Sequence, residues 1–325
     1  MQLLNKLILY LTTFTLIICF SFQGNLYAAQ PGRQAGGFLR LGLGADRVAM
    51  GDCGVALVGA DMNWYYNPAG LPFQKMRQAS FSYRFMSLDR KIMYAGYSMP
   101  LEPRAGLAIG ILRAGTDDID MRDSNGNHID WLSHSENLIH GSFAVQPHPK
   151  VALGLSIKWL INAVPNILDN DKNLYAYGMS VDLGAQVVVL PNLKLGLQIR
   201  DLGATYSWET SEVWGDELGA TEDNLPILIR CGAAWDPLPI ITVASDIIID
   251  PERAGDDSDA IEPHFGIEYR QPPFTLRTGS NGKTFTFGFG LELNLKIGKA
   301  RMDYAVYLED ISPDDAHLVS WVIEF

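Results

Sequence analysis

Residues 285–295 read Phe-Thr-Phe-Gly-Phe-Gly-Leu-Glu-Leu-Asn-Leu, and every odd-numbered residue in this stretch is large and apolar. The residues between them are glycine or polar. Successive side chains of a β-strand point to opposite faces of the sheet. The stretch therefore predicts a strand with one face in an apolar medium and the other face in a polar one.

The same alternation recurs along most of the chain after residue 78. It is clearest in residues 151–162, 193–200 and 301–309. By this alternation Leu195 and Phe287 are predicted to face lipid, whereas Gln198 and Thr286 are predicted to face the interior. Cys231 has the same parity as Ile229 and Trp235, so it is also predicted to face outward.

Strand length separates a membrane barrel from a soluble β-sandwich, which also alternates. Several segments alternate over 10 to 14 residues. Soluble strands usually have about 5 or 6 residues, whereas a tilted membrane strand needs about 9 to 11. We therefore predict fourteen strands, near residues 78–87, 91–99, 104–114, 134–146, 150–163, 174–189, 193–202, 225–236, 239–250, 262–271, 273–280, 284–295, 299–309 and 316–325.

The connections between these segments alternate between short and long. Short, mostly proline-bearing turns fall at 99–104, 146–149, 191–192, 236–237 and 271–272, and longer polar connections at 115–133, 164–173, 203–224, 251–261 and 310–315. Asn125-Gly126 is a favoured hairpin dipeptide, so a turn of a ribbon is expected there. Short turns at one end, long loops at the other and an even strand count are typical of outer-membrane barrels. The predicted fold is a 14-stranded antiparallel outer-membrane β-barrel over residues 78–325.

The last residues of the chain add a targeting signal. Trp321, Ile323 and the terminal Phe325 share one face of the last predicted strand. This ending resembles the C-terminal signal that barrel-assembly machinery reads, which makes that machinery an expected partner.

Residues 1–29 have the features of a secretory signal peptide. Lys6 precedes an apolar run over residues 7–20, and Ala28-Ala29 offers small residues for cleavage. The run is shorter than the roughly 20 residues of a membrane helix. A cleaved signal peptide and a barrel together predict the outer membrane as the location, with lipid and lipopolysaccharide as surroundings.

Composition excludes several classes of protein. The net charge of −12 disfavours nucleic acid as a partner. Cys53 and Cys231 are too few for a disulfide framework and lack metal-site spacing, so no metal or cofactor is expected. No grouping of Ser, His and Asp or of Cys and His argues for an enzyme. The acidic stretches 209–223 and 250–259 are interpreted as solvated loops, with divalent-cation contact to lipopolysaccharide as the alternative.

Residues 36–71, GGFLRLGLGADRVAMGDCGVALVGADMNWYYNPAGL, break the strand pattern. Their many glycines permit close-packed backbone. Asp61 can cap a short helix that runs to Tyr66, and Asn67-Pro68 would end it because a residue before proline avoids helical geometry. The segment is expected to form a small plug around which the later strands close.

The order of motifs in this segment resembles a known family. Phe38-Leu39-Arg40, Ala49-Met50-Gly51, Asp61 and Asn67-Pro68-Ala69-Gly70-Leu71 are similar to the N-terminal signature of the PorV/PorQ family, within the FadL superfamily of outer-membrane barrels. The resemblance implies that residues 30–77 form a hatch inside the lumen and that Asp61 and Asn67 to Leu71 belong to its motif. Asp52-Cys53 and Met62 depart from the family pattern, so the detailed function of the hatch stays open.

Charged residues at inward positions could have two roles. They could pair with each other and with the hatch, or they could line a path for a ligand, and the alternation fits both readings. These lumen-lining candidates are Arg84, Lys158, Asp182, Arg200, Arg230, Asp246, Glu268, Arg270, Arg277, Glu292, Arg301 and Asp303.

Two functions from different classes follow from the resemblance. FadL-like barrels imply transport of hydrophobic small molecules through a hatch-gated lumen. PorV implies the alternative, a non-conducting accessory of type IX protein secretion that engages cargo proteins. A hydrophobic ligand or secretion-system components are the corresponding partners.

Overall fold

The structure is a computed structural model that describes residues 35–58, 62–168, 172–208, 221–253, 260–296, 298–308 and 315–325. The predicted signal peptide lies outside these residues. The strands are β1 (Gln78–Phe85), β2 (Arg90–Leu101), β3 (Ala105–Arg122), β4 (His128–His148), β5 (Val151–Leu168), β6 (Lys172–Leu190), β7 (Leu193–Trp208), β8 (Thr221–Asn224), β9 (Leu228–Leu238), β10 (Ile241–Ile249), β11 (Ile261–Gln271), β12 (Phe274–Ser280), β13 (Phe285–Leu295), β14 (Gly298–Tyr307) and β15 (Ala316–Glu324).

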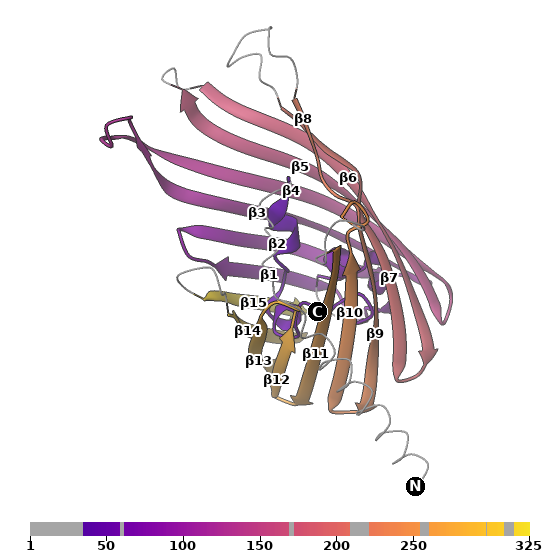
Figure 1. Cartoon of the computed structure of the whole chain (residues 1–325). Coiled ribbons are helices and arrows are strands. Elements are labelled where there is room, and N and C mark those ends of the chain that lie inside the picture. The colour runs from indigo at the N-terminus through magenta and orange to yellow at the C-terminus, as the bar shows by residue number, and fades with distance from the viewer. Residues whose placement is uncertain are drawn as a thin grey trace. The chain divides into compact units, whose positions relative to one another are not determined.

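These strands form one antiparallel sheet that closes on itself (Figure 1). β1 pairs with β15, from Gln78 opposite Glu324 to Phe85 opposite His317, and β6 pairs with β7. β8 is a four-residue strand that pairs with the far end of β7. The remaining fourteen strands form a closed barrel, which confirms the predicted fold class and strand number.

The alternation of the sequence becomes the inside and the outside of the barrel. Leu195 and Phe287 are 44% and 49% exposed on the outer surface, whereas Gln198 and Thr286 are 0% exposed. Large apolar side chains cover the outer face of most strands. An outward-facing apolar band with inward-facing polar side chains is the pattern of a transmembrane barrel.

Two connections that the sequence predicts as long loops, 115–133 and 164–173, are mostly strand, and strands extend into both ends of a third, 203–224, whose residues 209–220 lie outside the described ones. β3 and β4 pair as far as Arg122 opposite His128, β5 and β6 pair to Leu168, and β7 continues to Trp208. In the β3–β4 ribbon the alternation fades because the side chains on both faces are at least partly exposed, yet backbone pairing continues. The turn at Asn125-Gly126 lies where it was predicted, with the Asn125 and Asn127 amides bonded to Asp123. We call this end of the barrel the loop end, and the opposite end, with the short connections, the turn end.

The described residues before β1 form the N-terminal segment, residues 35–58 and 62–77. It contains η2 (Gly37–Arg40), α2 (Ala45–Val48), α3 (Asn63–Tyr66) and η3 (Pro68–Phe73). The helix predicted to end before Asn67-Pro68 is α3, and Asp61 lies outside the described residues. Within the described part of the chain, no helix is both long and apolar enough to span a membrane.

Candidate functional site

The N-terminal segment is buried against the inner surface of the barrel. Nearly all of its apolar side chains, including Leu39, Met50, Trp64 and Leu71, are at most a few per cent exposed. Figure 1 shows it in indigo among the strands. The barrel interior is therefore filled along this segment, and the contacts between segment and wall are the candidate functional site.

A ring of inward-facing glycines lets the backbone of the segment approach the wall. A Cβ on Gly196 would lie 2.0 Å from the carbonyl oxygen of Val55, and a Cβ on Gly184 would lie 2.2 Å from the Asn67 side chain. Glycine is the residue that permits such an approach. Eight strands contribute one such glycine each: Gly106, Gly154, Gly184, Gly196, Gly232, Gly266, Gly279 and Gly288. Alternation alone identifies these glycines only as residues of the polar face; the signal that marks them is the recurrence of glycine at one inward position on most strands.

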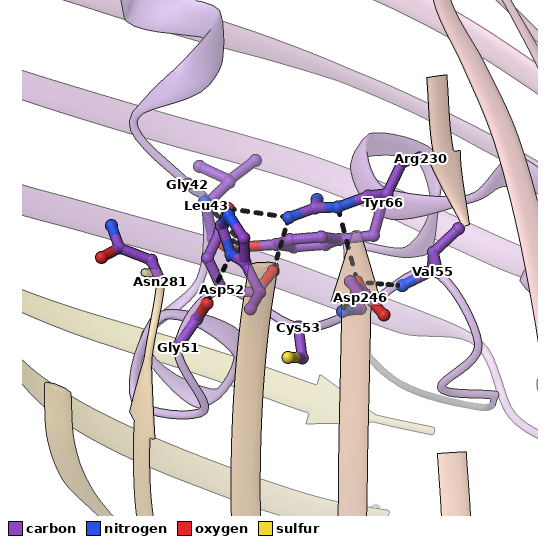
Figure 2. Close-up of polar contacts among 12 residues, drawn as sticks. Gly42, Leu43, Gly51, Asp52, Cys53, Val55, Tyr66, Arg230, Asp246 and Asn281 are labelled. Carbon is purple, nitrogen blue, oxygen red and sulfur yellow. Dashed lines mark hydrogen bonds and ion pairs between the residues drawn. The ribbon is translucent and has the colours of Figure 1, made fainter. Parts of the chain in front are cut away.

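The first polar anchor joins the segment to β9 and β10 (Figure 2). Arg230 donates to the carbonyl oxygen of Asp52 at 2.8 Å and to its carboxylate at 3.1 Å. Asp246 accepts from the amides of Gly54 at 2.8 Å and Val55 at 3.0 Å, and lies 3.4 Å from Arg230. Both predicted lumen candidates, Arg230 and Asp246, therefore hold the segment. Asp52 is the carboxylate partner of Arg230, whereas Asp246 binds the backbone of the segment.

Tyr66 completes this anchor from the side of the segment. Its hydroxyl donates to the Asp52 carboxylate at 2.5 Å and accepts from the Leu43 amide at 3.1 Å. Burial, together with the negative charge of Asp52, raises the pKa of Tyr66 well above its ordinary value. The phenol therefore stays protonated and available as a donor.

The second anchor lies on β5, β6 and β7. Arg200 donates to the carbonyl oxygen of Leu39 at 2.9 Å, and its guanidinium lies 4.5 Å from the Tyr65 ring centre. Next to it, Lys158 pairs with Asp182 at 2.7 Å and with Asp201 at 2.5 Å. All of these side chains are buried.

Asp201 belongs to this anchor, although parity alone places it on the outer face. A β-bulge interrupts the pairing of β6 and β7 between Val181 opposite Leu202 and Leu183 opposite Ile199. Asp201 has a φ of 59° in this bulge. The extra residue re-aims its side chain inward, toward Lys158.

The third anchor lies on β11, β12 and β14. Arg301 lies 3.5 Å from Asp46 of the segment and 2.7 Å from Asp303. Arg277 bonds Asp303 at 2.6 Å and Glu268 at 2.7 Å. Burial favours the neutral form of Asp46, but Arg47 and Arg301 outweigh it and hold the pKa of Asp46 below its ordinary value.

Three further lumen candidates lie outside these anchors. Arg84 is buried, donates to the carbonyl oxygen of Leu41 and lies 5.1 Å from the Tyr307 ring centre. Arg270 and Glu292 lie near the turn end with partly exposed side chains, where they pair with Glu268 and Lys299. The structure thus brings most of the predicted charges into contact with the segment or with each other.

The Asn67-to-Leu71 motif links both halves of the segment to the wall. The Asn67 side chain accepts from the Ala69 amide, which caps η3, and donates to the carbonyl oxygens of Val55 at 2.8 Å and Ala185 at 3.0 Å. Pro68 occupies the first position of η3, where proline is favoured. Leu71 and Ala69 are buried, and the side chain of Asn63 packs against Gly70.

The aromatic residues of the predicted assembly signal are exposed. Trp321 lies on the outer face of β15, and Phe325 lies at the chain end. The backbones of Arg77 and Phe325 exchange two hydrogen bonds. Cys53 is buried and Cys231 is partly exposed on β9, and both thiols are free. The part of the chain that the structure describes contains no group of His, Cys, Asp or Glu side chains arranged to hold a metal ion.

Comparisons with known proteins identify the fold. No protein-family model matches the sequence, and no curated protein matches it significantly. Among solved structures, the Pseudomonas putida toluene transporter TodX is similar with a TM-score of 0.60, 15% identity and coverage of 87% of this chain and 97% of that chain. The Ralstonia pickettii toluene transporter TbuX is similar with a TM-score of 0.59, 15% identity and coverage of 87% of this chain and 98% of that chain. A Pseudomonas aeruginosa FadL homologue is similar with a TM-score of 0.57, 9% identity and coverage of 86% of this chain and 97% of that chain. At these identities, the likeness establishes that this chain has the fold of FadL-type barrels.

Proposed function

We propose that the protein is an outer-membrane barrel that moves hydrophobic small molecules across the outer membrane, with the N-terminal segment as a hatch in its lumen. Its signal-like N-terminus, its apolar outer face and its FadL-type fold support the location. The fold-level neighbours named as toluene transporters support the class of substrate by analogy only.

The observation that carries this proposal is an apolar layer on the inner face of the wall. The strand register places Tyr94, Leu112, Leu138, Leu160 and Tyr206 in one layer across β2 to β7. These side chains are buried in one cluster with Phe38, Leu39 and Trp64 of the hatch. A water-filled barrel has a polar interior. An apolar layer between hatch and wall suits a hydrophobic molecule that enters when the hatch shifts.

A second candidate function is a non-conducting accessory of protein secretion. It is favoured by the buried ion pairs that fasten the hatch to the wall and by the extended β3–β4 ribbon, whose Ile129 and Trp131 are exposed. In that case, the ribbon would contact a protein at the cell surface and the hatch would stay in place.

Uptake by cells separates the two functions. Cells that carry the protein in their outer membrane are compared with cells that lack it, for radiolabelled toluene and for glycerol as a polar solute. The transport proposal predicts a several-fold rise in toluene uptake with little change for glycerol. Equal toluene uptake in both kinds of cell would exclude transport of this substrate class and leave the secretion accessory.

A further inference from the structure

The outer face of the barrel has its strand cations in one place. Below the tip of the β3–β4 ribbon, Lys91 on β2 and Arg113 on β3 are the only cations at outward positions among the strand residues that the structure describes. Lys91 lies opposite Gly115 and Arg113 opposite Met93, so the two cations are diagonal neighbours on one face of the sheet. Diagonal neighbours lie about 7–8 Å apart, within the joint reach of two long side chains. We call Lys91 and Arg113 the basic pair.

The basic pair lies where the apolar outer band ends. On β3 the outward side chains are apolar up to Ile111, and Arg113 is the first charged one. From Ala105, at the turn end of β3, to Arg113 the strand rises about 20 Å along the membrane normal, given about 3.4 Å per residue and a tilt of about 40°. The apolar band of such barrels is about 25 Å tall, so the pair lies near its boundary at the loop end. On the next strand, the polar Asn137 lies opposite Arg113.

The basic pair has more positive charge than its surroundings neutralise. Lys91 forms an ion pair with Asp117, and both side chains are partly exposed. Arg113 is exposed and makes no hydrogen bond or ion pair with the residues that the structure describes. The rings of Tyr83 and Phe85, 4.3 Å apart, lie on β1 beside the pair, where Phe85 is opposite Lys91. Aromatic side chains are typical of the level of the lipid headgroups on membrane barrels.

We propose that the basic pair binds a phosphate group of an outer-leaflet lipid, namely the phosphorylated glucosamine headgroup of lipopolysaccharide. The long loops of a barrel face the cell exterior, so the pair lies in the leaflet that this glycolipid forms. A guanidinium offers paired N–H donors to a phosphate, and an ammonium adds a point charge. An anion between Lys91 and Arg113 also relieves the repulsion of two like charges on neighbouring strands. The proposal rests on the location of the barrel in the outer membrane and does not depend on what the barrel transports.

The test uses the full chain, purified in a maltoside detergent, and native mass spectrometry of its complexes with added lipid A. Wild-type protein should retain lipid A that has its phosphates and should release lipid A from which they have been removed. A basic residue near an anionic lipid contributes about fivefold in affinity, so Lys91→Gln and Arg113→Gln should each weaken binding about fivefold and the double variant about 25-fold. Arg122→Gln is the matched control, because Arg122 is exposed at the ribbon tip beyond the apolar band, and its replacement should leave the affinity unchanged.

Three results would overturn the proposal. The first is equal binding of the two forms of lipid A by the wild-type protein, a comparison that needs no variant. The second is unchanged affinity in a double variant that keeps the compact, heat-modifiable form. The third is displacement of lipid A by inorganic phosphate in excess, which would show a site for any phosphate instead of one for the lipid. Cells that carry the double variant should take up toluene as wild-type cells do, so failure of this site is distinguishable from failure of the transport proposal.

Discussion

Arg230 on β9 bonds both the backbone carbonyl and the carboxylate of Asp52, at 2.8 and 3.1 Å, although 178 residues separate the two in sequence. The same guanidinium lies 3.4 Å from Asp246 and over the ring of Tyr66. One side chain of the wall therefore fixes a carboxylate of the N-terminal segment and supports a second carboxylate that binds the backbone of that segment.

Replacement of Arg230 should destabilise the barrel strongly. Arg230→Met removes the cation beside the buried Asp246 and the partly buried Asp52, and breaking a buried pair in this way costs about 3–5 kcal/mol. Unfolding in urea, followed by the loss of the compact, heat-modifiable form on gels, measures the change. Arg270→Met is the matched control, because its side chain is 55% exposed and exposed pairs contribute about 0–1 kcal/mol. Equal effects of the two changes would show that the Arg230 anchor does not hold the segment.

Inward glycines should tolerate no side chain where the segment touches the wall. Gly196→Ala places a Cβ 2.0 Å from the carbonyl oxygen of Val55, and overpacking of this kind costs about 1–3 kcal/mol. Gly141→Ala is the control, because nothing lies within 4 Å of a Cβ at that strand glycine. Assembly in membranes and urea midpoints should fall for Gly196→Ala alone. A fully stable Gly196→Ala barrel would place the segment elsewhere than against β7.

Charge on the outer face should oppose insertion. Leu195→Arg and Phe287→Arg put a cation on the apolar band. Near the bilayer midplane, such a change destabilises the folded barrel by about 2–4 kcal/mol. The inward positions Gln198 and Thr286 are poor controls, because Gln198 donates to the Tyr65 carbonyl and Thr286 accepts from the Gly51 amide. Asn294→Arg is the better one, since Asn294 has inward parity on β13 and is exposed at the turn end. If all three variants insert equally well, the apolar face does not meet lipid.

Cys53 should resist thiol reagents in the folded protein. Burial raises the pKa of the Cys53 thiol well above its ordinary value, with a further contribution from Asp246, so little thiolate forms at pH 8. Mass spectrometry after treatment with iodoacetamide should find Cys53 unmodified in the native barrel and modified after unfolding in urea. Rapid modification of Cys53 in the native state would contradict its burial against β10.

The sequence predicts the barrel well because the side chains of each strand alternate between only two environments. Lipid outside and polar groups inside impose alternation on each strand, so the faces of Leu195 and Phe287 follow directly. The ribbon β3–β4 lacks this signal, because both of its faces are exposed beyond the apolar band. Its extent could therefore not be read from the pattern.

The interior site is less predictable, because its partners meet only after the barrel has closed. Parity identifies Arg230 and Asp246 as inward, but nothing local pairs them with Asp52 or with the amides of Gly54 and Val55. Asp201 is placed by a bulge that parity does not contain. The anchors become apparent only from the register of the whole sheet.

The central claim, that the N-terminal segment acts as the hatch of a hydrophobic transport path, is tested most directly by fastening it to the wall. The Ala45 amide lies 2.8 Å from the Ser320 hydroxyl, so α2 touches β15 at this point. We therefore choose Ala45→Cys with Ser320→Cys, in a chain whose Cys53 and Cys231 are replaced by alanine, and measure the extent of disulfide formation first. The measurement is toluene uptake by cells before and after reduction of the disulfide. The account predicts that uptake is low in the oxidised form and returns on reduction. A disulfide that forms fully and leaves toluene uptake unchanged would contradict it.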